Sequence, residues 1–169
     1  MKPSKKISVW LASNFILLRS GLRALLTGRP TLECIGETGL SGDALELVEK
    51  AQPDVLILDV DLHDRRANAV LKRLSSKTPA TRIIALSVAG DKRSILRLLR
   101  CGVHGSLSHS EATAELVKAI EAVAQGDVFL CPSASMALLN EYRKRARRRA
   151  KGGASAGGQP KCQIVESGE

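Results

Sequence analysis

Residues 53–59 have the sequence Pro53-Asp54-Val55-Leu56-Ile57-Leu58-Asp59, a nearly unbroken apolar run that ends on a carboxylate. A short apolar run without polar alternation is typical of a central strand that helices cover on both faces. The segment Arg82–Ser87 has the same apolar character. Both segments indicate a parallel sheet that is buried between two layers of helices.

Apolar runs alternate with amphipathic stretches five times between residues 7 and 125, which is typical of βα units. We expect strands over 7–12, 32–36, 54–59, 82–87 and 103–108, and helices over 15–27, 42–51, 65–76, 91–101 and 111–125. The predicted fold class is α/β, a flavodoxin-like (βα)5 doubly wound parallel sheet of order 2-1-3-4-5 with strands two and five at its edges. A C-terminal basic helix is expected to follow it.

Helix ends are marked by residues that suit them. Ser110 is the expected N-cap of the fifth helix, with Glu111 in its first turn. Gly28, Gly102 and Gly126 are expected to follow helices in the left-handed conformation.

The chain has 169 residues, of which 44% are apolar, enough for one domain with a core and a short extension. Its formal charge is +9, and the last 30 residues, with eight Lys/Arg and three Asp/Glu, carry +5 of it. We expect a globular domain over 1–131, a basic linker helix over 132–151 with an apolar stripe of Met136, Leu139 and Tyr142, and a flexible Gly-rich tail over 152–169. The basic residues of the linker helix are Arg143, Lys144, Arg145, Arg147, Arg148, Arg149 and Lys151.

The apolar runs are far shorter than the roughly 20 residues that cross a bilayer, and the basic N-terminus is not followed by an apolar signal core. The four cysteines are widely spaced and form no CxxC pair, which favours reduced packing thiols. We therefore expect a soluble cytoplasmic protein that does not bind membranes.

A sheet of this order has its ligand crevice at the carboxyl ends of strands one and three, where the strand order reverses. Ser13, Asn14 and Asp59 are expected there. Ser87 and His109 follow strands four and five at the same rim, and the loop after strand three adds Asp61, His63 and Asp64.

Residues 7–132 resemble the receiver domain of two-component response regulators, in particular those of NarL/LuxR-type transcription regulators. Four segments carry the resemblance: Arg19–Leu26, Pro53–Asp59, Ala85–Ser87 and Ala119–Gly126. The resemblance implies a sensor histidine kinase as partner and transfer of its phosphoryl group to the aspartate after strand three, which is Asp59 here. It also implies a magnesium ion held by two acidic residues after strand one, and a lysine after strand five.

This sequence departs from that pattern around the pocket. Ser13 and Asn14 stand at the acidic pair, His109 at the lysine, and Ser106 at a position where the family often has an aromatic switch residue. His63-Asp64 replaces the usual Pro-Gly, whereas Ser87 keeps the hydroxyl of the switch position. Mg²⁺ enters such sites through carboxylates, so we expect weak or absent Mg²⁺ binding and no other cofactor. We also expect an imidazole to be too short to copy the reach of a lysine.

These departures predict a degenerate receiver that is not an enzyme and works without phosphorylation. Asp59 is then expected to accept hydrogen bonds from Ser87 and backbone amides. Two alternatives stay open: slow phosphorylation of Asp59, and a Zn²⁺ or Mn²⁺ site made by Asp59, Asp61, His63, Asp64 and His109.

The leading hypothesis for function is a signalling module that binds a partner protein or a second copy of itself. In receivers the face of helix four, strand five and helix five usually serves this purpose, and Arg93, Arg97 and Arg100 form a stripe on helix four here. The alternative is a DNA-binding transcription regulator in which residues 143–151 contact phosphates. No helix-turn-helix is expected after residue 150, so a stand-alone adaptor and a piece of a longer regulator are both open.

Overall fold

The computed structural model describes residues 5–40, 42–60, 65–87 and 92–153. Its strands are β1 (Ile7–Ala12), β2 (Leu32–Thr38), β3 (Val55–Asp59), β4 (Arg82–Ser87), β5 (Gly105–Ser108) and β6 (Phe129–Leu130). Its helices are α1 (Ile16–Leu26), α2 (Gly42–Ala51), α3 (Arg65–Lys77), α4 (Lys92–Arg100), α5 (His109–Ala124) and α6 (Pro132–Gly153). Within the described ranges no helix is both long and apolar enough to cross a membrane.

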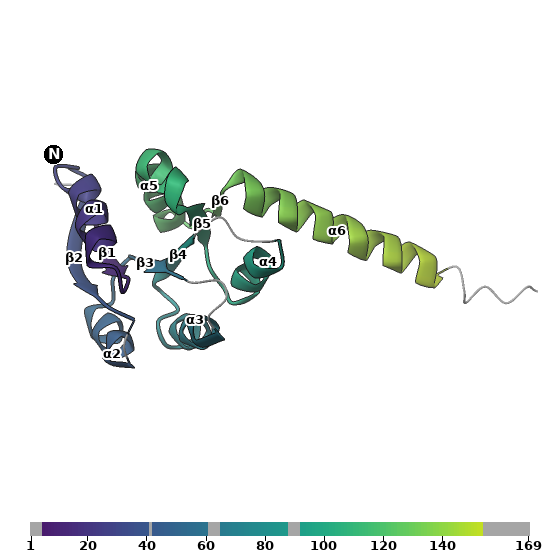
Figure 1. Cartoon of the computed structure of the whole chain (residues 1–169), viewed down its shortest axis with the longest axis horizontal. Coiled ribbons are helices and arrows are strands. Elements are labelled where there is room, and N and C mark those ends of the chain that lie inside the picture. The colour runs from purple at the N-terminus through teal and green to yellow at the C-terminus, as the bar shows by residue number, and fades with distance from the viewer. Residues whose placement is uncertain (1–4, 41, 61–64, 88–91, 154–169) are drawn as a thin grey trace, which may run out of the picture. The chain divides into compact units, whose positions relative to one another are not determined.

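The strands form one parallel sheet of order β2-β1-β3-β4-β5-β6 (Figure 1). The predicted doubly wound order is confirmed, but the prediction that strand five is an edge is wrong. Gly105 pairs with Phe129 and Ser106 with Leu130, so the short strand β6 covers that edge. Two residues are too few to show a period in the sequence, which is why β6 was missed.

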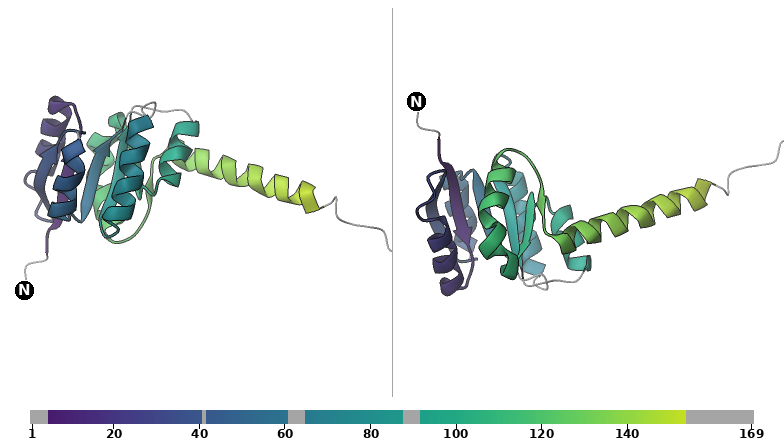
Figure 2. Two further views of the ribbon diagram at one scale, coloured as in Figure 1. Left: turned by 90° about the horizontal axis from the view of Figure 1, so that it is seen from below. Right: turned by 90° about the horizontal axis from the view of Figure 1, so that it is seen from above.

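Helices cover both faces of the sheet (Figure 2). On one face, α1 and α5 pack on apolar side chains of β1, β3, β4 and β5, such as Val9, Ile57 and Ile84. On the other face, α2, α3 and α4 pack on side chains such as Leu56 and Ile83. All five residues of β3 are buried, as the unbroken apolar run after Pro53 predicts.

The ends of three helices follow the glycine prediction. Gly28, Gly102 and Gly126 have φ angles of +81°, +87° and +99°, which confirms their left-handed conformation. The N-cap prediction for α5 is wrong by two residues, because Ser108 rather than Ser110 caps the helix.

The chain packs as two units, Met1–Ala137 and Leu138–Glu169. In the first unit the opening turns of α6 bury Ala134 and Ala137 together with Cys131 and with Ile95 of α4. The apolar stripe predicted for α6 is wrong, because Met136, Leu139 and Tyr142 are 53%, 42% and 70% exposed. Alanine is small enough for two helices to approach closely, and a count of large apolar residues overlooks such a contact.

Candidate functional site

Ser13 and Asp59 meet at the carboxyl ends of β1 and β3. The two strands are parallel neighbours with Ala12 opposite Leu58, so the next residue of each chain segment reaches the same rim of the sheet. The Ser13 hydroxyl donates a hydrogen bond of 2.6 Å to Oδ2 of Asp59. Both residues are buried, and Asp59 is 5% exposed. A buried carboxylate needs such donors, because an unpaired one has lost its hydration without compensation.

His109 supplies the second partner of the same carboxylate. Its Nε2 atom lies 2.8 Å from Oδ1 of Asp59, and the imidazole is 32% exposed. A carboxylate only accepts, so the Nε2–H group is the donor. The imidazole therefore reaches the Asp59 carboxylate itself. His109 is the first residue of α5, and the start of that helix brings the ring to the end of β3.

A capping box holds the first turn of α5 in place. The Ser108 hydroxyl accepts from the backbone N–H of Glu111 at 3.3 Å, and the Glu111 carboxylate accepts from the Ser108 backbone N–H at 2.9 Å. The same carboxylate accepts from the Ser108 hydroxyl at 2.6 Å. The Ser-x-x-Glu spacing is the sequence signature of this motif and could have located the cap.

Further contacts orient the loop between β1 and α1. The Ser13 hydroxyl accepts from the Phe15 backbone N–H at 3.0 Å, and the Arg19 guanidinium donates to the Ser13 carbonyl. Sequence reasoning did not assign Arg19 this role. The Asn14 side chain bonds to a different part of the chain from Ser13: its Oδ1 accepts a hydrogen bond from the Leu40 backbone N–H at 2.7 Å. Asn14 therefore ties the end of β1 to the chain that follows β2.

Ser87 and Ser106 lie on neighbouring strands of the same half of the sheet. Ser87 ends β4 opposite Ser108, and Ser106 lies within β5 opposite Ala85. Both are buried. Among the described residues, the side-chain hydrogen bonds of Asp59 come from Ser13 and His109 rather than from Ser87. Asp61, His63 and Asp64 lie outside the described residues.

The residues of this pocket do not fit the magnesium ion that the resemblance implies. Asp59 is the one carboxylate that the described part brings to the pocket, and each of its oxygens already accepts a hydrogen bond. Ser13 offers a hydroxyl that donates to Asp59, and Asn14 uses its oxygen elsewhere. Mg²⁺ prefers carboxylates in octahedral geometry. Within the described ranges no group of three or more His, Cys, Asp or Glu is placed to hold any metal.

His104, just before β5, has a structural role. Its Nδ1 accepts from the Ile83 backbone N–H at 3.1 Å. Burial lowers the pKa of the imidazole below its usual value of 6.5, and the nearby Arg82 charge lowers it further. His104 therefore accepts as a neutral ring.

The predicted basic residues whose side chains the structure describes are exposed. In α6, Arg143, Lys144, Arg147, Arg148 and Arg149 are exposed, and Arg145 is exposed beside Glu141, with Nε 3.3 Å from the carboxylate. Lys151 lies within the same helix. On α4, Arg97 and Arg100 are exposed.

The sequence model of one protein family, the response regulator receiver domain, matches residues 9–121 of this chain. The chain is 27% identical over 139 residues to the transcriptional regulatory protein DegU of Brevibacillus brevis, and the match covers 82% of this chain and 59% of DegU. It is 30% identical over 142 residues to the DNA-binding transcriptional activator DevR/DosR of Mycobacterium tuberculosis, covering 84% of this chain and 65% of that protein.

Among solved structures, a two-component response regulator of the LuxR family from Aurantimonas is similar with a TM-score of 0.73 at 24% identity, covering 82% of this chain and 99% of that one. That likeness shows a shared fold. The chain spans about six tenths of the length of DegU, with 59% covered. The family model covers more than half of the chain, and the chain therefore belongs to the response regulator receiver domain family.

Proposed function

We propose that this receiver domain works without phosphorylation and acts by binding a partner protein rather than as an enzyme. The observation that supports the proposal is the double engagement of Asp59, whose two carboxylate oxygens accept hydrogen bonds from Ser13 and His109 at 2.6 Å and 2.8 Å. Both oxygens of Asp59 thereby have hydrogen-bond donors from side chains of the same protein.

The chemistry of aspartyl phosphorylation argues in the same direction. A carboxylate oxygen is a weaker nucleophile while it accepts a hydrogen bond, and the negative charges of nucleophile and phosphoryl group must be screened as they approach. In this pocket one oxygen faces a hydroxyl and the other an imidazole, and the described residues supply no second carboxylate for a metal. Among the residues that the structure describes, neither a second carboxylate for a metal nor a lysine is present to screen the charge of Asp59.

Intact-protein mass after incubation with Mg²⁺ and acetyl phosphate tests the proposal. We expect no added phosphoryl group, and no change in Trp10 fluorescence when Mg²⁺ and beryllofluoride, a phosphoryl mimic, are added. Trp10 is a suitable reporter because it lies on β1, three residues before Ser13. A phosphoryl adduct that Asp59→Asn abolishes would refute phosphorylation independence.

A gain-of-function variant checks that the pocket residues, and not a defect elsewhere, keep Asp59 inert. Ser13→Asp, Asn14→Asp and His109→Lys together restore the charged groups that the family uses. We expect this triple variant to bind Mg²⁺ and to accept a phosphoryl group on Asp59. A folded triple variant that stays inert would show that our assignment of these positions is wrong.

We propose the outward side of α4 and α5, beside β5, as the surface for the partner, with a second copy of the chain as the first candidate. The apolar edge of this region is covered by β6 and by Ala134 and Ala137 of α6. The exposed remainder is polar and carries both signs of charge, with Arg97 on α4 and the Glu115–Lys118 ion pair on α5. Such a surface suits an interface governed by charge complementarity.

Sedimentation analysis over a range of protein concentrations measures this association. We expect a dimer whose dissociation constant rises severalfold with Lys118→Glu on α5 and stays unchanged with Lys50→Glu on α2, since both lysines are exposed. A monomer at all concentrations would refute the homodimer and leave a heterologous partner, to be sought among sensor kinases. Equal effects of the two variants would exclude α5 as the interface.

A second candidate function is DNA contact through α6. It is favoured by the exposed cations of that helix, and the relative DevR/DosR is named as a DNA-binding activator. Basic side chains that neutralise phosphates release counterions, so such binding weakens steeply with salt. Binding of labelled duplex DNA in a salt series, with Arg143→Gln, Lys144→Gln and Arg147→Gln combined, tests this candidate. Unchanged affinity in the triple variant would exclude it.

A further inference from the structure

The positive charge outside α6 is concentrated in one stretch of the receiver domain. Residues 65–100, which span α3, β4 and α4, contain ten Lys/Arg and one Asp, a net charge of +9. The rest of residues 1–139 contains eight Lys/Arg and 13 Asp/Glu, a net charge of −5. Such segregation is not what a uniformly solvated surface produces, because mixed signs are the common pattern there.

The stretch folds so that its cations share one surface. Helices α3 and α4 lie side by side on the same face of the sheet (Figure 1), and the Ser75 hydroxyl of α3 donates to the Cys101 carbonyl at the end of α4 at 2.9 Å. We call this surface the α3–α4 face. Its described exposed cations are Lys72, Arg73, Lys77, Arg97 and Arg100.

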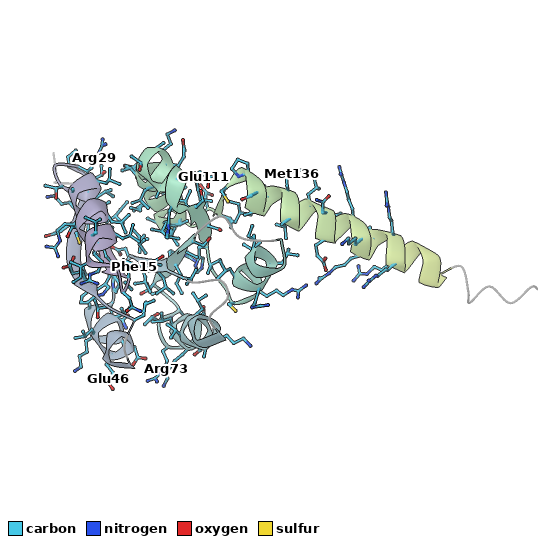
Figure 3. The ribbon with its side chains drawn as sticks, in the orientation of Figure 1. Phe15, Arg29, Glu46, Arg73, Glu111 and Met136 are labelled. Carbon is cyan, nitrogen blue, oxygen red and sulfur yellow. The ribbon has the colours of Figure 1, made fainter. Side chains whose placement is uncertain are left out.

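Most of these cations are available to an external anion. Arg73 points outward from α3 (Figure 3), and its Nε lies 4.0 Å from the Glu49 carboxylate, at the limit of an ion pair. Within the described residues, Lys72, Lys77 and Arg97 take part in no ion pair. Lys77 and Arg97 lie in the last turns of their helices, where the negative end of the helix dipole stabilises a cation.

The residue types on the α3–α4 face favour one class of polyanion over lipid surfaces and single-stranded nucleic acids. Every large apolar side chain that is conspicuously exposed in the described structure lies outside α3 and α4, so the face has nothing to insert into a lipid interface. The four aromatic residues, Trp10, Phe15, Phe129 and Tyr142, also lie elsewhere, so single-stranded bases find no stacking partner. A regular array of phosphates is the ligand that purely cationic, non-stacking chemistry suits.

We propose that the α3–α4 face of the receiver domain binds the phosphate backbone of duplex DNA without reading its sequence. The inference deepens the second candidate function and adds a contact made by the domain body itself, independent of the cations of α6. The relative DevR/DosR is named as a DNA-binding activator, which describes that whole protein. In the present protein, the receiver domain contributes phosphate contacts of its own.

Three variants that lose the same charge test the inference in the full chain. The face variant carries Lys72→Gln, Lys77→Gln and Arg97→Gln. The control carries Lys5→Gln, Lys6→Gln and Lys50→Gln, and the α6 variant carries Arg143→Gln, Lys144→Gln and Arg147→Gln. Each changes the formal charge from +9 to +6. Affinity for a short labelled duplex of arbitrary sequence is measured by fluorescence anisotropy across a salt series.

For the face variant we expect the slope of log affinity against log salt to become shallower by about 2 to 3, and affinity near 0.1 M salt to fall about tenfold or more. The control is expected to behave as the wild type within about twofold. Equal losses in the face variant and the control would overturn the inference, because net charge alone would then explain binding. An unchanged face variant would overturn it as well.

The α6 variant separates this inference from the second candidate function. Loss of binding in the α6 variant alone would support DNA contact through α6 and overturn DNA contact through the α3–α4 face. Loss of binding in the face variant alone would support the α3–α4 face and exclude α6. No duplex binding by the wild type overturns both, as does tighter binding to anionic vesicles or to polyaspartate than to duplex DNA.

A measurement without substitutions guards against a misfolded variant. Lysine acylation of the wild-type protein, read by mass spectrometry with and without duplex DNA, reports which amines the ligand covers. We expect DNA to protect Lys72 and Lys77 and to leave Lys50 reactive, since all three are exposed in the free protein. Equal reactivity of Lys72 and Lys77 with and without bound DNA would contradict the inference.

Discussion

The imidazole Nε2 of His109 and the carboxylate Oδ1 of Asp59 lie 2.8 Å apart, although 50 positions separate the two residues in the chain. This contact joins the end of β3 to the start of α5, the helix that follows β5, and in the sheet β4 lies between β3 and β5. Together with the 2.6 Å hydrogen bond from Ser13, it turns the pocket into a closed polar network. Such a network stabilises the fold when all its members are satisfied.

Replacement of Asp59 by alanine should therefore destabilise the protein. The variant leaves the Ser13 hydroxyl and the His109 imidazole without their acceptor, and we expect the free energy of unfolding to fall by about 1–3 kcal/mol. Urea unfolding followed by circular dichroism measures it, with Asp127→Ala, at an exposed carboxylate, as the control. A variant as stable as the wild type would mean that desolvation of the carboxylate cancels its hydrogen bonds.

The contact between Asp59 and His109 can be isolated by a double-mutant cycle. We expect the losses of Asp59→Ala and His109→Ala to be non-additive by about 0.5–3 kcal/mol, because the two side chains share one hydrogen bond. The same cycle between Asp59 and Lys50, which is exposed on α2, should be additive. An additive Asp59–His109 cycle would argue that the pair contributes nothing to stability.

The cap of α5 makes a further prediction about stability. Ser108→Ala removes the hydroxyl that accepts from the Glu111 backbone N–H, and we expect a loss of about 0.5–2 kcal/mol in the free energy of unfolding. Ser110→Ala, two positions later, should cost clearly less, because Ser110 caps no backbone group of α5. Equal losses for the two variants would contradict the capping box.

His104 predicts a dependence of stability on pH. Its pKa in the folded protein is depressed, first by burial and then by the Arg82 charge, so below the unfolded value of about 6.5 the unfolded chain binds more protons. The free energy of unfolding should therefore fall as the pH decreases from about 6.5 towards the folded pKa. We expect His104→Gln, which does not titrate, to show a smaller fall in urea unfolding between about pH 7 and pH 5. Parallel curves for variant and wild type would exclude His104 as the source.

Two glycines predict opposite effects of a single methyl group. A Cβ at Gly36 would lie 2.2 Å from Cζ3 of Trp10, so Gly36→Ala must displace the indole ring, and we expect lower stability and altered Trp10 fluorescence. At Gly21, inside α1, a Cβ meets nothing within 4 Å, and we expect Gly21→Ala to stabilise by up to about 1 kcal/mol. Thermal unfolding and emission spectra compare the two. Unchanged fluorescence in Gly36→Ala would contradict the stacking of Trp10 on this glycine.

The sequence by itself determined the sheet and the rim of its pocket. Apolar runs such as Val55–Asp59 are long enough to show that helices cover both faces, and the order of a doubly wound sheet then brings Ser13 and Asp59 to one edge. Gly28, Gly102 and Gly126 could be assigned to helix ends because a left-handed residue without a Cβ is favoured there.

Only the tertiary structure decided how the side chains at that edge pair. Which donors reach Asp59 depends on the position of the first turn of α5 to within about an ångström, and no period or composition carries that information. The burial of Ala134 and Ala137 in place of Met136 and Leu139 was likewise decided by packing, because a helix turns its small residues inward where a neighbour such as α4 comes close. The α3–α4 face also required the fold, since charges on two successive helices share a surface only once those helices lie side by side.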